Sequence, residues 1–239
     1  VRLIAYQKML PRTPESQELI HNVRTVASPE GTLVGGVAAD YTDSQDGIAR
    51  TLPWALTWIV LSVLVLIFIF TGSIILPIKA VILNFLSLGA TMGVLTWVFI
   101  GGNLQWLVGS FTVTGTLDTS IVILIAVVVF GLSMDYELFL LSRIREEHLA
   151  GKSNVESVAI GLQRSARIIT AAAVLLAVVF AAFVTSGVTS IKTMGFGVAL
   201  AVILDATIVR GLLVPALMRL FGENNWWAPK WMQRFTLRH

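Results

Sequence analysis

Residues 119–142 read TSIVILIAVVVFGLSMDYELFLLS, and this segment decides the fold. Its first half is an unbroken apolar run, and about twenty such residues cross a hydrocarbon core of roughly 30 Å. Its second half places Asp135, Tyr136 and Glu137 inside the same apolar stretch. A carboxylate in the hydrocarbon layer costs about 2.5–3.5 kcal/mol on insertion scales, so an intramembrane carboxylate indicates an ion or proton pathway by default.

Four other segments have a similar length and hydropathy. Together the spans are expected at residues 52–71, 76–99, 119–141, 167–186 and 193–218. They form a predicted transmembrane domain over residues 51–221, followed by an interfacial tail over residues 222–239. Because five is an odd number, the two ends of the domain are expected on opposite faces of the membrane.

The composition agrees with a multi-pass membrane protein. Of 239 residues, 56% are apolar and 13% are charged, and the mean hydropathy is +0.82. Soluble domains carry about 25% charged residues, so this balance excludes soluble, disordered and collagenous classes. The chain has no cysteine, and His21, His148 and His239 lie far apart in sequence. We therefore expect no disulfide, no metal centre and no cofactor.

The basic residues indicate topology and not nucleic-acid binding. The net charge is +3, but most Lys and Arg residues beyond the first fifty positions flank apolar spans. Nine lie in the loop between the third and fourth spans or after the fifth: Arg143, Arg145, Lys152, Arg164, Arg167, Arg219, Lys230, Arg234 and Arg238. The two loops on the other side contain only Lys192. Positive loops stay in the cytoplasm, which predicts a cytoplasmic C-terminus and an extracytoplasmic N-terminus.

Residues 1–50 are predicted to be a partial extracytoplasmic β-α-β segment. A strand is expected at residues 1–9 and a second one at residues 33–39. Between them, Thr13 is a helix N-cap and Pro14 the first helical residue, which predicts a helix to about Val26. About forty residues are too few to bury a core, so partner elements are expected upstream or in another chain. Since the chain begins with Val1 and not with Met, we expect a piece of a longer protein.

Two features are expected at the inner membrane surface. Ser153 and Glu156 have capping-box spacing before an apolar stripe, predicting an interfacial helix ahead of the fourth span. After the fifth span, Trp226, Trp227 and Trp231 stand with Lys230 and Arg234 as an aromatic and basic belt.

The polar residues inside the spans form the candidate site. Asp205 and Arg210 are five residues apart, about 140° on an α-helix, so they are expected to be poor partners within their own helix. Asp135 and Arg210 lie at similar depths, and a charge pair between them is feasible. Asp205 would then need a hydroxyl, a water chain or a proton, which is the physical basis of a proton-coupling site. The alternative is an internal ion pair that only fixes helix packing.

Small and polar residues line other helix faces. Ala173, Ala177 and Ala181 repeat every four residues, as do Gly195 with Ala199 and Gly197 with Ala201, a pattern typical of close helix packing. Asn84, Ser87 and Thr91 share one face of the second span. This polar face is either an inter-helix contact or the wall of a hydrated path.

Several motifs resemble the MmpL family of mycobacterial-type transporters within the resistance-nodulation-division (RND) superfamily. FGLSMDYE at residues 130–137, continuing through FLLSRIREE at 139–147, resembles the tenth transmembrane helix of that family. NFLSLG at 84–89, LDATIVR at 204–210 with Pro215 downstream, and WWAP at 226–229 are also similar. The resemblance covers about residues 2–234.

This resemblance implies an α-helical membrane protein. It would be the five-helix C-terminal half of an RND-type transporter bundle, preceded by the end of a porter-like α/β domain. The implied function is proton-motive-force-driven export of lipids or other hydrophobic compounds across the cytoplasmic membrane. Asp135 and Tyr136 match the tenth-helix proton-relay pair, and Asp205 and Arg210 match polar positions of the twelfth helix. The partnering pair belongs to a missing N-terminal half, in the same or a separate chain.

Two other classes remain open. A non-transporting membrane scaffold, or truncated remnant, would tolerate substitution of Asp135. An intramembrane aspartyl protease would use Asp135 and Asp205 as a dyad that activates water. The expected Tyr-Asp and Gly-x-Gly-Asp settings are absent, because Tyr136 follows Asp135 and Leu204 precedes Asp205. We therefore expect no enzymatic activity.

Overall fold

The computed structural model describes residues 4, 6, 8, 11, 13–26, 32–113 and 115–229. Regular structure in these ranges is entirely helical: α1 (Pro14–Thr25), α2 (Val37–Thr71), α3 (Ile75–Leu95), α4 (Gln105–Val108), α5 (Thr119–Leu149), α6 (Asn154–Phe183), α7 (Thr189–Leu204) and α8 (Val214–Phe221). Two π-helical segments, Thr96–Ile100 and Asp205–Leu213, continue α3 and α7, and a 3₁₀ turn, Gly222–Trp226, follows α8. The chain divides into two compact units, residues 1–59 and 60–239.

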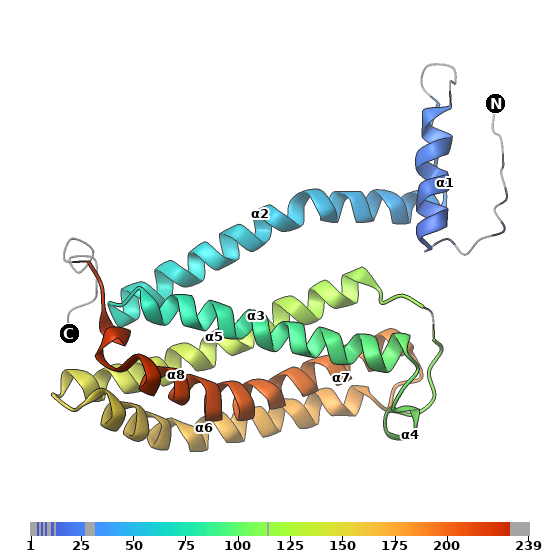
Figure 1. Ribbon diagram of the computed structural model, residues 1–239. Helices are drawn as coiled ribbons and strands as arrows, with labels where there is room; N and C mark the ends of the chain where they lie inside the picture. The colour runs from blue at the N-terminus through green and yellow to red at the C-terminus, as the bar shows by residue number, and fades with distance from the viewer. Residues whose placement is uncertain are drawn as a thin grey trace. The chain divides into compact units, whose positions relative to one another are not determined.

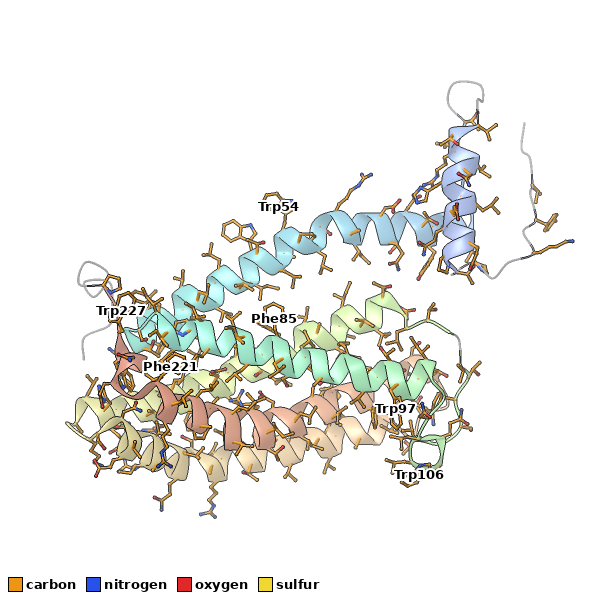
Figure 2. The ribbon with its side chains drawn as sticks, in the orientation of Figure 1. Trp54, Phe85, Trp97, Trp106, Phe221 and Trp227 are labelled. Atoms are coloured by element: carbon orange, nitrogen blue, oxygen red, sulfur yellow. The ribbon has the colours of Figure 1, made fainter. Side chains whose placement is uncertain are left out.

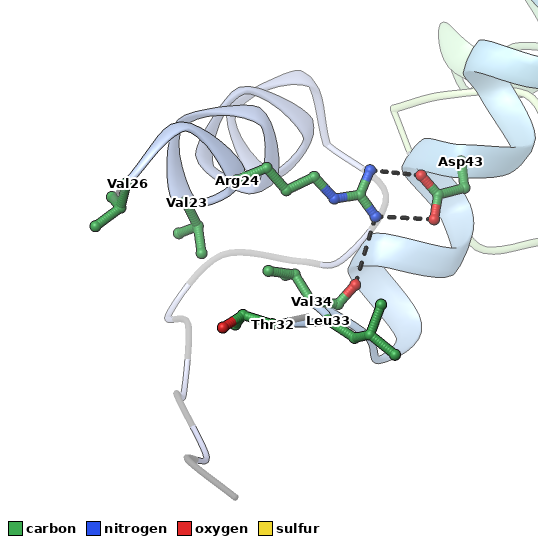
Figure 3. A pocket seen from close by; sticks show the side chains of 7 residues that line it. All are labelled: Val23, Arg24, Val26, Thr32, Leu33, Val34 and Asp43. Atoms are coloured by element: carbon green, nitrogen blue, oxygen red, sulfur yellow. Dashed lines mark hydrogen bonds and ion pairs between the residues drawn. The ribbon is translucent and has the colours of Figure 1, made fainter. Parts of the chain in front are cut away.

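The first unit contains α1 and the start of α2. The predicted N-cap is confirmed, because the Thr13 side chain accepts a hydrogen bond from the Ser16 amide and Pro14 is the first helical residue. Arg24 of α1 donates to both Asp43 carboxylate oxygens at 2.5 and 2.8 Å, and to the Val34 carbonyl at 3.4 Å. Figure 3 shows how this guanidinium group joins the two helices beside a shallow pocket.

The predicted strand at residues 33–39 is wrong. Residues 32–35 have no regular structure, Gly36 has a positive φ of 117°, and Val37 begins α2. A strand needs a neighbour for its backbone N–H and C=O groups, and the described part of the first unit supplies none. The backbone groups from Val37 onward are paired within a helix instead. The strand expected at residues 1–9 lies almost entirely outside the described residues.

The predicted number of membrane spans is confirmed within the described ranges. Five helical stretches are long and apolar enough to cross a bilayer: Val37–Thr71, Ile75–Ile100, Thr119–Leu149, Asn154–Phe183 and Thr189–Trp226. The second, third and fifth start within a few residues of the predicted spans. The first does not, because α2 begins at Val37 and the predicted span 52–71 is only its second half. The fourth differs, because α6 runs unbroken from the Ser153–Glu156 capping box to Phe183. The expected interfacial helix is therefore the first part of the span itself.

In the second unit, α3, α5, α6 and α7 with α8 run side by side as a bundle (Figure 1). Its core is two apolar clusters, one around Leu95, Ile125 and Val198 and the other around Leu140, Ile144 and Met218. The small residues allow the close approach expected of them. A Cβ on Gly195 would lie 2.6 Å from the Phe180 carbonyl oxygen, and one on Gly161 would lie 2.6 Å from Ile144. Glycine is therefore required where α6 meets α7 and α5.

Aromatic residues mark the two ends of the bundle (Figure 2). Trp97 and Trp106 lie exposed at one end, and Phe221 and Trp227 at the other. Such belts are typical of membrane interfaces. Trp226 stacks on His148 with ring centroids 4.2 Å apart and donates to Asn154, and its place in a belt stays a prediction. Trp231, Lys230 and Arg234 lie outside the described residues.

Lys192 is the basic residue found in the two loops that were predicted to be extracytoplasmic, and it stabilises the structure there. It is buried and donates to the Val108 carbonyl at 2.9 Å, where α4 ends. The ammonium group thus binds the carbonyl end of a short helix, the position where a cation is favourable.

Candidate functional site

A buried polar network lies between the two apolar clusters, where α5 meets the π-helical segment Asp205–Leu213. Arg210 Nε donates to Asp205 Oδ2 at 2.8 Å, and its Nη2 lies 2.7 Å from the same oxygen. Ser133 Oγ of α5 donates to Asp205 Oδ1 at 2.9 Å, while Arg210 Nη2 donates to the Ser133 carbonyl. All three side chains are buried. The network therefore joins two spans through charge-assisted hydrogen bonds, which are stronger than neutral ones.

The backbone explains why Asp205 and Arg210 meet, against the prediction that they are poor partners. That prediction assumed an α-helix, but residues 205–213 are π-helical, and the Val214 amide bonds the Val209 carbonyl five residues earlier. A π-turn closes between residues i and i+5, so side chains five apart return to the same face. Arg210 is consequently paired with Asp205 and not with Asp135.

Pro215 accounts for the local widening of the helix. It lies at the start of α8, directly after the π-helical segment. Proline has no N–H, and its ring clashes with the carbonyl four residues earlier, which here is that of Gly211. A wider turn relieves that clash. The sequence signal for this pair was therefore Asp205 and Arg210 at a spacing of five residues, with Pro215 following them.

Tyr136 lies beside the network. The guanidinium carbon of Arg210 is 5.2 Å from the centroid of its ring, within cation–π range. A cavity of about 10 Å³ is lined by Tyr136, Ser133 and Asp205 together with apolar residues of α6 and α7. About this volume holds one water molecule when polar groups line it. The predicted residues Tyr136, Asp205 and Arg210 thus form one site.

Asp135 is not part of that site. Its side chain is exposed on the surface of this chain, on the face of α5 opposite Ser133, because two helical residues apart corresponds to about 200°. The feasible pair between Asp135 and Arg210 is therefore wrong. The same placement separates Asp135 from Asp205, so these two residues do not form the dyad that the aspartyl-protease alternative requires.

Glu137 belongs beside the network although the sequence interpretation gave it no role. It is one helical turn after Ser133, is only 6% exposed, and lines a second cavity with Lys79 of α3. Glutamate is almost never buried without a partner. Glu137 follows Ser133 by four residues, and residues four apart share one face of an α-helix. This spacing could have predicted that Glu137 lies on the same face as Ser133.

Asn84, Ser87 and Thr91 are all buried. Thr91 donates to the Ser87 carbonyl in its own helix at 2.9 Å. The Asn84 amide, the Ser87 hydroxyl and Arg210 Nη1 have no hydrogen-bond partner in the described part of the chain. Buried polar atoms normally bind protein or ordered water, so helix contact and a hydrated path both stay predictions for this face.

The fold and this network define a multi-pass helical membrane protein with an ion pair sealed inside its bundle. The sequence profile of the MMPL family matches residues 1–237. The chain belongs to the MMPL family.

The chain is also similar to several bacterial membrane proteins. A putative membrane protein of Streptomyces coelicolor is 44% identical over 92% of this chain and 31% of its own length. The trehalose monomycolate exporter MmpL3 of Mycobacterium tuberculosis is 42% identical over 97% of this chain and 25% of its own. The mycolic acid-containing lipids exporter MmpL11 of Mycolicibacterium smegmatis is 40% identical over 87% and 22%. The chain thus spans between a fifth and a third of the length of these relatives.

Proposed function

We propose that this chain is the C-terminal part of a proton-motive-force-driven exporter of lipids or other hydrophobic compounds across the cytoplasmic membrane. The buried Asp205–Arg210–Ser133 network carries this proposal. Placing charges inside the bundle is costly, so such groups generally serve a transport path or a proton relay. The lipid-exporter names of the relatives support the substrate class.

The position of Asp135 supports a partner beyond this chain. An exposed carboxylate on an apolar span has no place against lipid, so we assign the Asp135 face of α5 to contact with the missing N-terminal half, in the same or a separate chain. Transporter sites lie between two structural repeats. In this arrangement Asp135 and Tyr136 form the relay at the repeat interface, and Asp205 and Arg210 support it from within the bundle.

We further propose that the bundle end holding the α5–α6 turn and residues 222–229 is cytoplasmic. These two segments meet there, since the Asn154 amide donates to Glu223 and its side chain to the Met218 carbonyl. Basic residues concentrate at this end, as the positive-inside rule requires. The N-terminal segment is then extracytoplasmic.

Single-cysteine labelling tests this orientation. This chain has no native cysteine, so one introduced into a cysteine-free transporter is the only target. In intact cells, a cysteine at Ala150 is expected to be protected from a membrane-impermeant maleimide, while one at Ser110 should react. Both positions are exposed, so both should react after cell lysis, which serves as the control. The opposite labelling pattern would reverse the orientation.

Reconstitution of the complete transporter tests the function. Transfer of a glycolipid out of the donor leaflet is expected to require an imposed proton gradient and to stop when a protonophore is added. Vesicles that contain only this chain should transfer nothing, because one repeat does not complete a transport site. Glycolipid transfer at an unchanged rate after addition of the protonophore would refute proton coupling. No transfer by the complete protein for any lipid would favour the scaffold alternative.

A further inference from the structure

The buried Glu137 carboxylate is an unexplained charge in the second unit. It is 6% exposed, and no residue in the described ranges donates a hydrogen bond to it. A carboxylate without a partner is unfavourable in an apolar environment, so it must bind water or take up a proton. In the second case Glu137 exchanges a proton with its surroundings.

A cavity beside Glu137 provides the place for that exchange. It has a volume of about 10 Å³ and is lined by Glu137, Lys79 and apolar residues of α3, α5 and α8, among them Leu83, Leu141 and Met218. This is about the volume that one water molecule requires. The cavity is therefore about the size of a single water molecule, and Glu137 and Lys79 both line it.

Lys79 connects the cavity to the end of the bundle. It is half-buried in the second turn of α3, donates to Asn225 Oδ1, and approaches the Leu217 carbonyl at 3.5 Å. Asn225 is fully buried and in turn donates to the Met218 carbonyl at 2.6 Å. A line of polar groups thus runs from Glu137 to the bundle end that is cytoplasmic in the proposed orientation.

The charged groups that face Glu137 come from both sides. Lys79 of α3 lies on the side of the bundle end, while Asp205 and Arg210 of the π-helical segment lie on the side of the network. The residues of α8 that line the cavity, Val214, Leu217 and Met218, are apolar. Glu137 therefore lies between the buried network and Lys79. Among the described residues, Lys79 is the one cation that lines this cavity.

We propose that Glu137 is a proton carrier on the cytoplasmic side of the Asp205–Arg210–Ser133 network, with Lys79 guiding release through the shared cavity. In each cycle the Glu137 carboxylate accepts the proton of a protonated Asp205, which returns Asp205 to its carboxylate form. Glu137 then releases one proton to water at the Lys79 end, which regenerates the Glu137 carboxylate. This inference rests on the proposed proton-driven function. It adds a proton-release step on the cytoplasmic side, which the relay pair Asp135 and Tyr136 does not provide.

The test measures proton flux and its pH profile in proteoliposomes that contain the complete transporter. Glu137→Gln is expected to lower flux per molecule at least tenfold and to remove the dependence on cytoplasmic-side pH. Glu137→Asp should retain flux with a displaced pH profile. Glu146→Gln is the matched control, because Glu146 is a carboxylate of the same helix that is exposed and lies outside this cavity, and it should behave as wild type.

The outcomes separate this inference from the proposed function. Wild-type flux and pH profile in Glu137→Gln, with flux abolished in Asp135→Asn, would overturn the role of Glu137 alone. Undiminished flux in Asp135→Asn would instead remove the proposed function itself. If Glu137→Gln does not accumulate in the membrane, Glu137→Asp decides: a displaced pH profile supports the carrier, and an unchanged one refutes it.

Discussion

Replacing Asp135 by Asn in the complete transporter is expected to reduce proton-driven export to background, with membrane abundance and thermal stability near wild type. Asn keeps the size and most hydrogen bonds of the carboxyl group but binds no exchangeable proton. Asp135 is exposed on this chain and makes no pair with Arg210, so its replacement leaves no buried charge inside the bundle. Export assays and thermal unfolding of the purified protein measure the two quantities separately.

Glu146→Gln is the control for this experiment. Glu146 is also an exposed carboxylate of α5, and its contact is an ion pair with Arg143 at 2.9 Å. Exposed pairs of this kind contribute about 0–1 kcal/mol, so export and stability should both persist. Wild-type export by Asp135→Asn would end the relay assignment. Loss of abundance in step with activity would make Asp135 a structural residue of the interface.

Replacing Asp205 by Asn is expected to destabilise the bundle as well as stop export. The substitution leaves Arg210 as a buried cation without its counter-charge, and breaking a buried ion pair costs about 3–5 kcal/mol. Asp205→Asn combined with Arg210→Gln should recover most of that stability, since no net charge then remains buried. Export should stay absent in the double variant if the pair serves proton coupling.

Thermal unfolding in detergent and export per molecule are the measurements. Thr207→Val is the matched control in the same π-helical segment, because Thr207 is exposed and donates only to the Ile203 carbonyl of its own helix at 2.6 Å. Wild-type stability of Asp205→Asn would show that the pair does not hold the bundle together. Export by the double variant would reduce the network to a packing element.

The sequence was a good guide wherever local chemistry decides structure. Uninterrupted apolar length gave the five spans, and side-chain caps gave the starts of α1 and α6. It was a poor guide at residues 33–39, because a strand depends on neighbours that a short segment does not contain. It also placed a break before the fourth span, although nothing in residues 154–183 stops a helix once it is capped.

The candidate site shows the same division. Its residue types were predictable, because charged groups inside apolar spans are conspicuous. Their partners were not, because the prediction assumed 3.6 residues per turn where the helix is wider. Because of that single assumption, Asp135 was predicted as the partner of Arg210, whereas the partner is Asp205. Glu137 was passed over since its burial and its cavity depend on α3 and α8, which lie far away in sequence.

The π-helical segment also gives the fifth span a mechanical property. It accommodates one extra residue in a turn, so its return to α-helical geometry would rotate everything after it by about 100°, the angle of one α-helical residue. The Asp205–Arg210 pair spans that turn and fits only its wider form. Neutralising either charge would remove one of two constraints on this turn and leave Pro215 as the other. Any rotation at the turn would be passed to α8, and with it to Met218, whose carbonyl binds Asn225. The angular position of the last part of the fifth span is therefore fixed by Pro215 and by one buried ion pair.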